Sequence, residues 1–226
     1  MAECPFCTLV GLPNLEAEAD TTALQMTRVV IDESEHFLVL LDIAPLAEGH
    51  CLVISKFHLP AYIFLVGQEP LWNEFASLLA SVRRQATEIF SVEPILFEHG
   101  ASWESDTPSC CINHAHMHVV PTNADVATRL EMAGLRRIAV GGYTADVAEV
   151  IADTPYFFYQ GSPTGGIFYD AGGAPSQFLR QVIGEQLDLA FWNWHDYIIL
   201  NDEEAVLSLL AQARAKFKAW RSNSNV

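Results

Sequence analysis

Hydrophobic residues recur in short runs over the first 125 residues, and polar or turn-forming residues bound each run. Residues 27–31 and 37–41 are rich in β-branched and large apolar side chains, and the polar segment 32–35 separates them, which predicts a β-hairpin. The apolar runs 50–55, 94–97 and 115–121 predict further strands. Together these runs predict a sheet of about five strands.

Residues 69–90 follow a different period. Pro70 stands near the start, and apolar residues then recur at steps of three and four: Leu71, Trp72, Phe75, Leu78, Leu79, Val82, Ala86 and Ile89. This spacing predicts one long amphipathic helix between the strands. The first part of the chain is therefore expected to have an α+β fold.

The remaining hundred residues have weaker patterns. Residues 156–160 and 167–170 predict a second hairpin, Ser176 is a candidate cap for a helix, and Asp202 is a candidate cap for a helix over residues 203–220. The aromatic cluster at residues 191–194 is typical of a packed corner. We expect a compact domain at residues 1–125, with residues 126–226 forming an α/β extension packed on the same domain.

The composition narrows the functional classes. The 226 residues are 50% hydrophobic and carry a formal net charge of −16, which favours a globular protein and disfavours non-specific binding to nucleic acid. The apolar runs fall short of the ~20 residues that span a bilayer, and the N-terminus lacks the pattern of a secretory signal. We therefore expect a cytosolic protein without membrane association, in which cysteines bind metal or are buried rather than form disulfides.

The most informative segment contains His114, His116 and His118. Side chains alternate between the two faces of a strand, so these three imidazoles are expected to project to one side. Ala115, Met117 and Val119 would then project to the other side, which favours a core strand. Three histidines on one face of a core strand indicate a chemical function rather than packing.

Cys4 and Cys7 have the spacing with which two thiolates bind a zinc ion from a single turn. A tetrahedral ion needs two more ligands, and the sequence contains no second Cys-x-x-Cys pair. Histidines would have to complete the site. From the residues alone, a redox pair or two unliganded thiols remain alternatives.

These motifs occur in a specific order: residues 41–45 (Leu-Asp-Ile-Ala-Pro), residues 49–58 from Gly49-His50 to His58, and the histidine segment. In this combination the chain resembles the histidine-triad (HIT) superfamily of nucleotide hydrolases and transferases over roughly residues 4–121. The resemblance implies a five-stranded antiparallel sheet, usually a homodimer, and a nucleoside phosphate bound over the histidine strand.

The zinc-containing branch of this family implies roles for the cysteines. By that resemblance Cys4, Cys7, His58 and His114 would surround one zinc ion. Four protein ligands leave no open position for a substrate water, so the zinc would be structural.

The resemblance also implies the catalytic residues. His116 would be the nucleophile that forms a nucleotidyl-histidine intermediate, and His118 would bind the phosphoryl oxygens or the leaving group. Asp42 would accept hydrogen bonds from ribose hydroxyls, although spacing alone fits a turn aspartate equally well. Phe37 would line the base pocket, with a core position as the default. His50 receives only a structural or peripheral role.

Two positions depart from the family pattern at places that usually contact phosphate. Glu98 stands where many members have an asparagine, and Cys111 replaces a hydroxyl. A carboxylate beside a phosphate is unfavourable unless it is protonated or paired. Both residues are nevertheless candidates for substrate binding, and Arg180 of the extension is a candidate cation for the phosphate.

The leading interpretation is a nucleotide hydrolase that cleaves a phosphoanhydride or phosphoramidate, with a small nucleotide as its partner. Alternatives are a nucleotidyl transferase or phosphorylase with an acceptor other than water, and a non-catalytic nucleotide-binding module. A metallohydrolase with zinc bound by His114, His116 and His118 also remains possible in principle.

Overall fold

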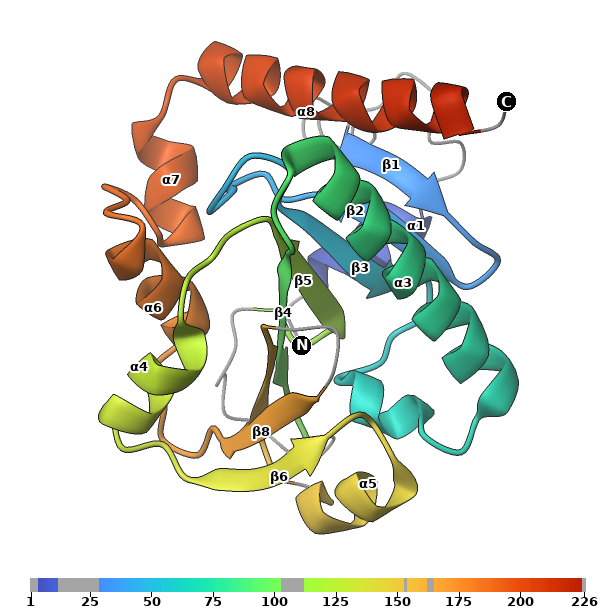
Figure 1. Ribbon diagram of the computed structural model, residues 1–226, viewed down its shortest axis with the longest axis vertical. Helices are drawn as coiled ribbons and strands as arrows, with labels where there is room; N and C mark the ends of the chain where they lie inside the picture. Colours follow the sequence, from blue (N-terminus) through green and yellow to red (C-terminus); the bar gives the residue numbers. More distant parts are fainter. Residues whose placement is uncertain (1–3, 12–28, 103–111, 153, 162–164, 225–226) are drawn as a thin grey trace.

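The computed structural model describes residues 4–11, 29–102, 112–152, 154–161 and 165–224 (Figure 1). Its strands are β1 (Val30–Glu33), β2 (Phe37–Leu41), β3 (Cys51–Ser55), β4 (Ile95–Gly100), β5 (His116–Val120), β6 (Arg137–Gly141), β7 (Tyr156–Gln160) and β8 (Gly166–Asp170). They form one sheet in the order β1-β2-β3-β5-β4-β7-β8-β6, in which every neighbouring pair is antiparallel.

The α+β class is confirmed, but the expected sheet of five strands is too small. Strands β1 to β5 come from the first 125 residues, and β7, β8 and β6 continue the same sheet. The reason lies at β4, whose residues Leu96 to Gly100 pair with β7. This pairing satisfies backbone groups that would otherwise form an open edge.

The helices are α1 (Pro5–Gly11), the 3-10 turn η1 (Tyr62–Leu65), α3 (Glu69–Phe90), α4 (Val126–Met132), α5 (Ala145–Ile151), α6 (Phe178–Gln186), α7 (Trp194–Leu200) and α8 (Glu203–Ser224). Figure 1 shows α8 running across one end of the molecule beside β1 and α3, in agreement with its contacts to both. None of the helices in the described ranges combines the length and apolar character needed to cross a membrane.

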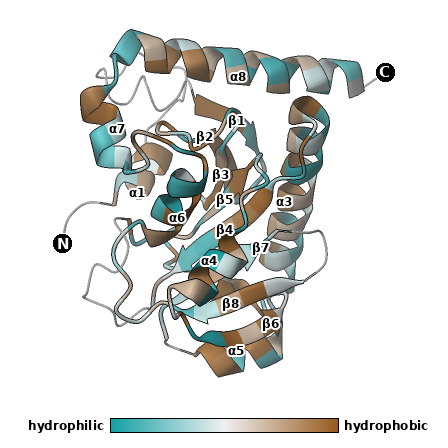
Figure 2. Ribbon diagram, turned by 60° about the vertical axis from the view of Figure 1, so that its left-hand side comes forward, coloured by the Kyte–Doolittle hydropathy of each residue, from teal (hydrophilic) through white to brown (hydrophobic). Residues whose placement is uncertain are grey.

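Two hydrophobic clusters lie on opposite faces of the sheet. Leu96 packs in the cluster that α3 covers, whereas its neighbours Ile95 and Phe97 pack in the cluster that α4 and α6 cover. Alternation along β4 accounts for this division. Figure 2 shows that the central strands are mostly hydrophobic, and every residue of β2 and β3 is buried. The histidine strand β5 therefore has the fully buried strand β3 as one of its two neighbours.

Candidate functional site

Strand β5 presents the histidines to one face of the sheet. Ala115, Met117 and Val119 are at most 1% exposed and pack in the cluster under α3. His116 and His118 line a cavity on the opposite face, with their ring centroids 5.0 Å apart. The alternation predicted from the sequence thus places two imidazoles side by side at a cavity wall.

A backbone carbonyl fixes the tautomer of His116. Nδ1 of His116 lies 2.6 Å from the carbonyl oxygen of His114. Because a carbonyl can only accept, Nδ1 must carry the hydrogen, and the lone pair of the neutral ring then resides on Nε2. Burial lowers the pKa of His116, so the neutral ring dominates at neutral pH. His116 therefore has the form that a nucleophile requires.

His118 has the opposite tautomer, and His50 determines it. The backbone N–H of Leu46 donates to Nδ1 of His50 over 3.1 Å, so the hydrogen of the neutral His50 ring is on Nε2. That Nε2 donates to Nδ1 of His118 over 2.9 Å, which leaves an N–H on Nε2 of His118. Burial lowers the pKa of His50 to about 4 and that of His118 well below its usual value, so both rings are neutral. Of the structural or peripheral role expected for His50, these contacts fit the structural one.

Asp42 is paired with an arginine of the C-terminal segment. Its Oδ2 accepts a hydrogen bond from Nη1 of Arg180 over 2.8 Å, and its Oδ1 accepts one from the N–H of Ala44 over 2.8 Å. Burial alone would raise the pKa of Asp42, but the charges of Arg180 and His50 and these hydrogen bonds outweigh it and lower the pKa. The proposed ribose ligand and the proposed phosphate ligand thus contact each other.

The cavity has a volume of about 170 Å³ and is mostly apolar. Asp42, His116 and His118 line it together with residues of the HIT-like region such as Phe6 and Phe97. The C-terminal segment supplies Gln177, Phe178, Leu179, Arg180 and Trp194. Residues beyond position 125 therefore form one wall of the site, and Arg180, the candidate cation of the extension, is among them.

The structure corrects the expectation for Phe37. This side chain is fully buried and packs its ring against Phe57, Tyr62 and Phe75. It belongs to the core and is not among the residues that line the cavity. Phe37 thus has the core position that the sequence analysis gave as its default.

Glu98 also lies away from the cavity. Its Oε2 accepts hydrogen bonds from the hydroxyls of Tyr143 and Tyr156 over 2.7 and 2.6 Å, and its Oε1 accepts one from the N–H of Tyr62 over 2.8 Å. Burial raises the pKa of Glu98 to about 7 despite these hydrogen bonds, which lower it. Its neighbour His99 points to the cavity instead, as alternation along β4 requires.

Cys111 lies outside the described residues. Its expected contact with phosphate stays a prediction.

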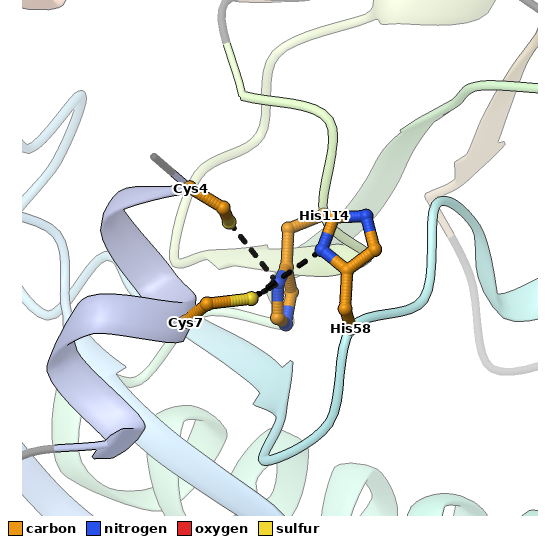
Figure 3. Close-up of side chains that lie close together, drawn as sticks. All are labelled: Cys4, Cys7, His58 and His114. Atoms are coloured by element: carbon orange, nitrogen blue, oxygen red, sulfur yellow. Dashed lines mark hydrogen bonds between the residues drawn. The ribbon is translucent and has the colours of Figure 1, made fainter. Parts of the chain in front are cut away.

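Cys4, Cys7, His58 and His114 form a second group, in which one ligand atom from each residue lies within 4.8 Å of the others. Cys4 directly precedes α1 and Cys7 lies within it, and both thiols point toward the imidazoles, as Figure 3 shows. The Sγ atom of Cys4 is 3.4 Å from Nδ1 of His114, and Sγ of Cys7 is 3.4 Å from Nδ1 of His58 and 3.6 Å from Nδ1 of His114.

These distances fit a tetrahedral zinc site. Zinc bonds of ~2.3 Å to sulfur and ~2.0 Å to nitrogen at tetrahedral angles place the two atoms about 3.5 Å apart. Nε2 of His114 lies 2.9 Å from the carbonyl oxygen of Ser55 and must donate to it. The lone pair of His114 is thereby on Nδ1, which faces the thiols, and the backbone contact orients the ring as a metal ligand requires.

Comparisons with known proteins address the first part of the chain. Residues 23–125 match the family model of the HIT domain. Comparison with curated protein sequences finds no significant match.

Several solved structures are similar. A hypothetical histidine triad nucleotide-binding protein from Sulfolobus tokodaii is 25% identical, with a TM-score of 0.38, over 53% of this chain and 68% of that chain. A Zn-bound histidine triad family protein from Mycobacterium smegmatis is 26% identical, with a TM-score of 0.35, over 54% and 77% of the two chains. A HIT family protein from Bacillus anthracis is 21% identical, with a TM-score of 0.40, over 55% and 76%. The chain therefore contains a region, residues 23–125, that is similar to the HIT domain and carries the histidine motif.

Proposed function

We propose that this protein is a nucleotide hydrolase in which His116 attacks the α-phosphorus of a nucleoside phosphoanhydride or phosphoramidate. The observation that carries the proposal is the opposite tautomers of two adjacent rings. His116 has a lone pair on Nε2, and His118 has a hydrogen on Nε2. A nucleophile and a hydrogen-bond donor thus stand side by side at one cavity, which suits displacement at a phosphorus centre.

In the proposed first step, Nε2 of His116 forms a bond to phosphorus while the bond to the leaving group breaks, and the leaving group departs as a phosphate anion or as an amine that takes a proton from solvent. The imidazole becomes cationic, and its Nδ1–H keeps its hydrogen bond to the carbonyl of His114. The N–H of His118 stabilises the negative charge that develops on the phosphoryl oxygens or the leaving group. In the second step, water attacks phosphorus and loses a proton to solvent, and His116 leaves as the neutral ring.

We also propose that Cys4, Cys7, His58 and His114 bind one structural zinc ion. The support is the fit of the sulfur and nitrogen distances to tetrahedral coordination. When bound, zinc would cross-link α1 to the histidine strand and would offer no position to a substrate. Helix α1 also carries Phe6, whose ring lies 5.7 Å from that of His116, so the cross-link would position part of the cavity wall.

The ring contacts argue against one zinc bound by the three histidines. Nδ1 of His114 faces the thiols and its Nε2 faces the carbonyl of Ser55, while Nδ1 of His118 accepts from His50 and its Nε2 carries a hydrogen. Of the three rings, only His116 therefore presents a lone pair to the cavity. Among the described residues, the groups with metal-binding spacing do not combine His114, His116 and His118.

A transferase that uses an acceptor other than water would share the first displacement, and a binding module would lack it. The proposed partner in each case is a small nucleotide, since the net charge of −16 opposes binding of a polyanion. The extension formed by residues 126–226, the homodimer and the cytosolic location stay predictions.

Turnover of adenosine phosphoramidate and of dinucleoside polyphosphates tests the proposal. The wild type should release a nucleoside monophosphate, and His116→Asn should be inactive because an amide does not form the intermediate. Equal inactivity of both proteins toward the whole panel would favour the binding module. Transfer of the nucleotidyl group to an added anion, with no hydrolysis in its absence, would favour the transferase.

A further inference from the structure

We propose that Arg180 is a specificity-determining residue, which occupies the carboxylate of Asp42 so that the cavity binds ribonucleotides and 2′-deoxyribonucleotides about equally well. The inference rests on the proposed function, because it requires a nucleotide beside His116.

Both oxygens of the Asp42 carboxylate accept hydrogen bonds within the protein, which use two of its roughly four lone-pair positions. Oδ1 accepts the N–H of Ala44, and Oδ2 accepts Nη1 of Arg180, each over 2.8 Å. The residue is only 6% exposed, so protein atoms surround most of the carboxylate. A ribose diol needs two acceptor positions that face the ligand. With Arg180 in place, each oxygen of Asp42 already accepts one hydrogen bond inside the protein, so ribose hydroxyls would have to share oxygens that are already engaged.

The position of Arg180 is built into the fold. Nε donates to the carbonyl oxygen of Trp192 over 3.1 Å, and Nη2 donates to the carbonyl oxygen of Ala44. The neighbours Leu179 and Ile183 on α6 pack in the second hydrophobic cluster. Both side chains of the ion pair are 7% exposed. The pair is thus held by a packed helix and by several hydrogen bonds, unlike a solvated surface pair.

Charge supports the same role for Arg180. Asp42, His50 and His118 have a spacing that could hold a cation. The guanidinium of Arg180 already supplies a positive charge at the carboxylate, and both histidines are neutral. An unpaired carboxylate at this cavity would repel a phosphate bound to His118. Arg180 removes that repulsion, and it removes the acceptor for sugar hydroxyls at the same time.

Binding of nucleoside monophosphates tests the inference without turnover. Titration calorimetry with AMP and dAMP, and with the corresponding guanosine, cytidine and uridine pairs, gives the ratio of ribo to deoxy affinity. For the wild type this ratio should stay below about 3, since no strong hydrogen bond to the 2′-hydroxyl is made. In Arg180→Met the ratio should rise to about 10 or more, because a hydroxyl bonded to a charged acceptor contributes that much.

Two further variants complete the design. The double variant Asp42→Asn with Arg180→Met should return toward the wild-type ratio, since an amide oxygen is a weaker acceptor than a carboxylate. Arg136→Met should not change it, because Arg136 pairs with Asp170 and is 70% exposed at its side chain. Thermal unfolding checks that each variant is folded.

A wild-type ratio of about 10 or more would overturn the inference, and this outcome needs no variant. An unchanged ratio in folded Arg180→Met would also overturn it. Either result leaves the proposed function intact if His116 still forms its intermediate. Failure of every nucleotide to bind the wild type would overturn both.

Discussion

Nε2 of His50 lies 2.9 Å from Nδ1 of His118, and both rings are almost completely buried. Since the N–H of Leu46 occupies the other nitrogen of His50, the hydrogen positions along this chain of contacts are determined. A backbone N–H thus controls, through one imidazole, which nitrogen of the next imidazole presents a hydrogen to the cavity.

Replacing His50 should slow catalysis without abolishing substrate binding. In His50→Ala, both tautomers of His118 become accessible, and we expect kcat to fall by about 100-fold with KM changed much less. His50→Gln should recover part of the loss, because one amide oxygen and one amide N–H can replace the two contacts. Steady-state kinetics of the three proteins measure this. Equal losses in both variants, or a loss confined to KM, would contradict a positioning role.

Zinc should be needed for stability rather than for the chemical step. We expect one zinc ion per chain by elemental analysis, and Cys7→Ser should lose it and unfold at a lower temperature, because metal binding stabilises only the folded chain. Cobalt substitution should give the absorption bands of thiolate ligation. The matched control is Cys51→Ala: Cys51 is fully buried in β3 and is not a member of the group, so this variant should keep its zinc.

A different set of results would indicate a catalytic zinc ion. If chelation abolished turnover of a protein that stayed folded, and cobalt gave no thiolate bands, a catalytic ion bound by histidines would be favoured instead.

Glu98 should make the protein less stable as pH rises. Its pKa in the folded state is about 7, above the ordinary value of 4.5, so between these values the folded chain holds a proton that the unfolded chain has lost. The contribution of Glu98 therefore falls as pH increases from about 4.5 to about 7, and the full penalty above pH 7 is roughly 3 kcal/mol. The groups that face this carboxyl are Tyr62, Tyr143 and Tyr156.

The measurement for Glu98 is the difference in free energy of unfolding between the wild type and Glu98→Gln across this pH range. We expect the variant to gain relative to the wild type as pH rises. A difference that is constant from pH 4.5 to 8 would show that Glu98 titrates normally.

The ion pair between Arg180 and Asp42 should stabilise the contact between α6 and the segment that follows β2. Arg180→Met leaves a buried carboxylate without its partner, and we expect the free energy of unfolding to fall by about 3 kcal/mol. Asp42→Asn combined with Arg180→Met should lose less than the sum of the single variants. Urea unfolding of the four proteins gives the coupling directly, and strictly additive effects would show that the two side chains do not interact in solution.

The local elements were predictable where the chain has a clear period. Helix α3 and strand β2 have the predicted bounds, because residues 69–90 repeat at helical spacing and residues 37–41 form an apolar run between polar segments. Strand β6 was not predicted. It lies at the edge of the sheet with partly exposed residues, so no alternation of apolar and polar side chains marks it.

In the candidate site too, local relationships were predictable from the sequence and long-range contacts were not. Period-two alternation was sufficient to place His116 and His118 on one face, because that relationship is local. The contacts of Glu98 with Tyr143 and Tyr156, and of Asp42 with Arg180, join residues 45 to 138 positions apart. Such pairs are set by how strands and helices pack, and the residues near each partner give no sign of them. The role of His50 has a partial signal, since β3 pairs with β5 and places His50 near His118.

The most direct test of the account is to trap the covalent intermediate. The protein is mixed with a panel of nucleoside phosphoramidates and dinucleoside polyphosphates, quenched rapidly, and mapped by mass spectrometry of its peptides. We expect one nucleoside monophosphate on the peptide that contains His116, at Nε2, and none in His116→Asn. A modification on another residue, or turnover by wild type with no adduct at any quench time, would contradict the central role of His116.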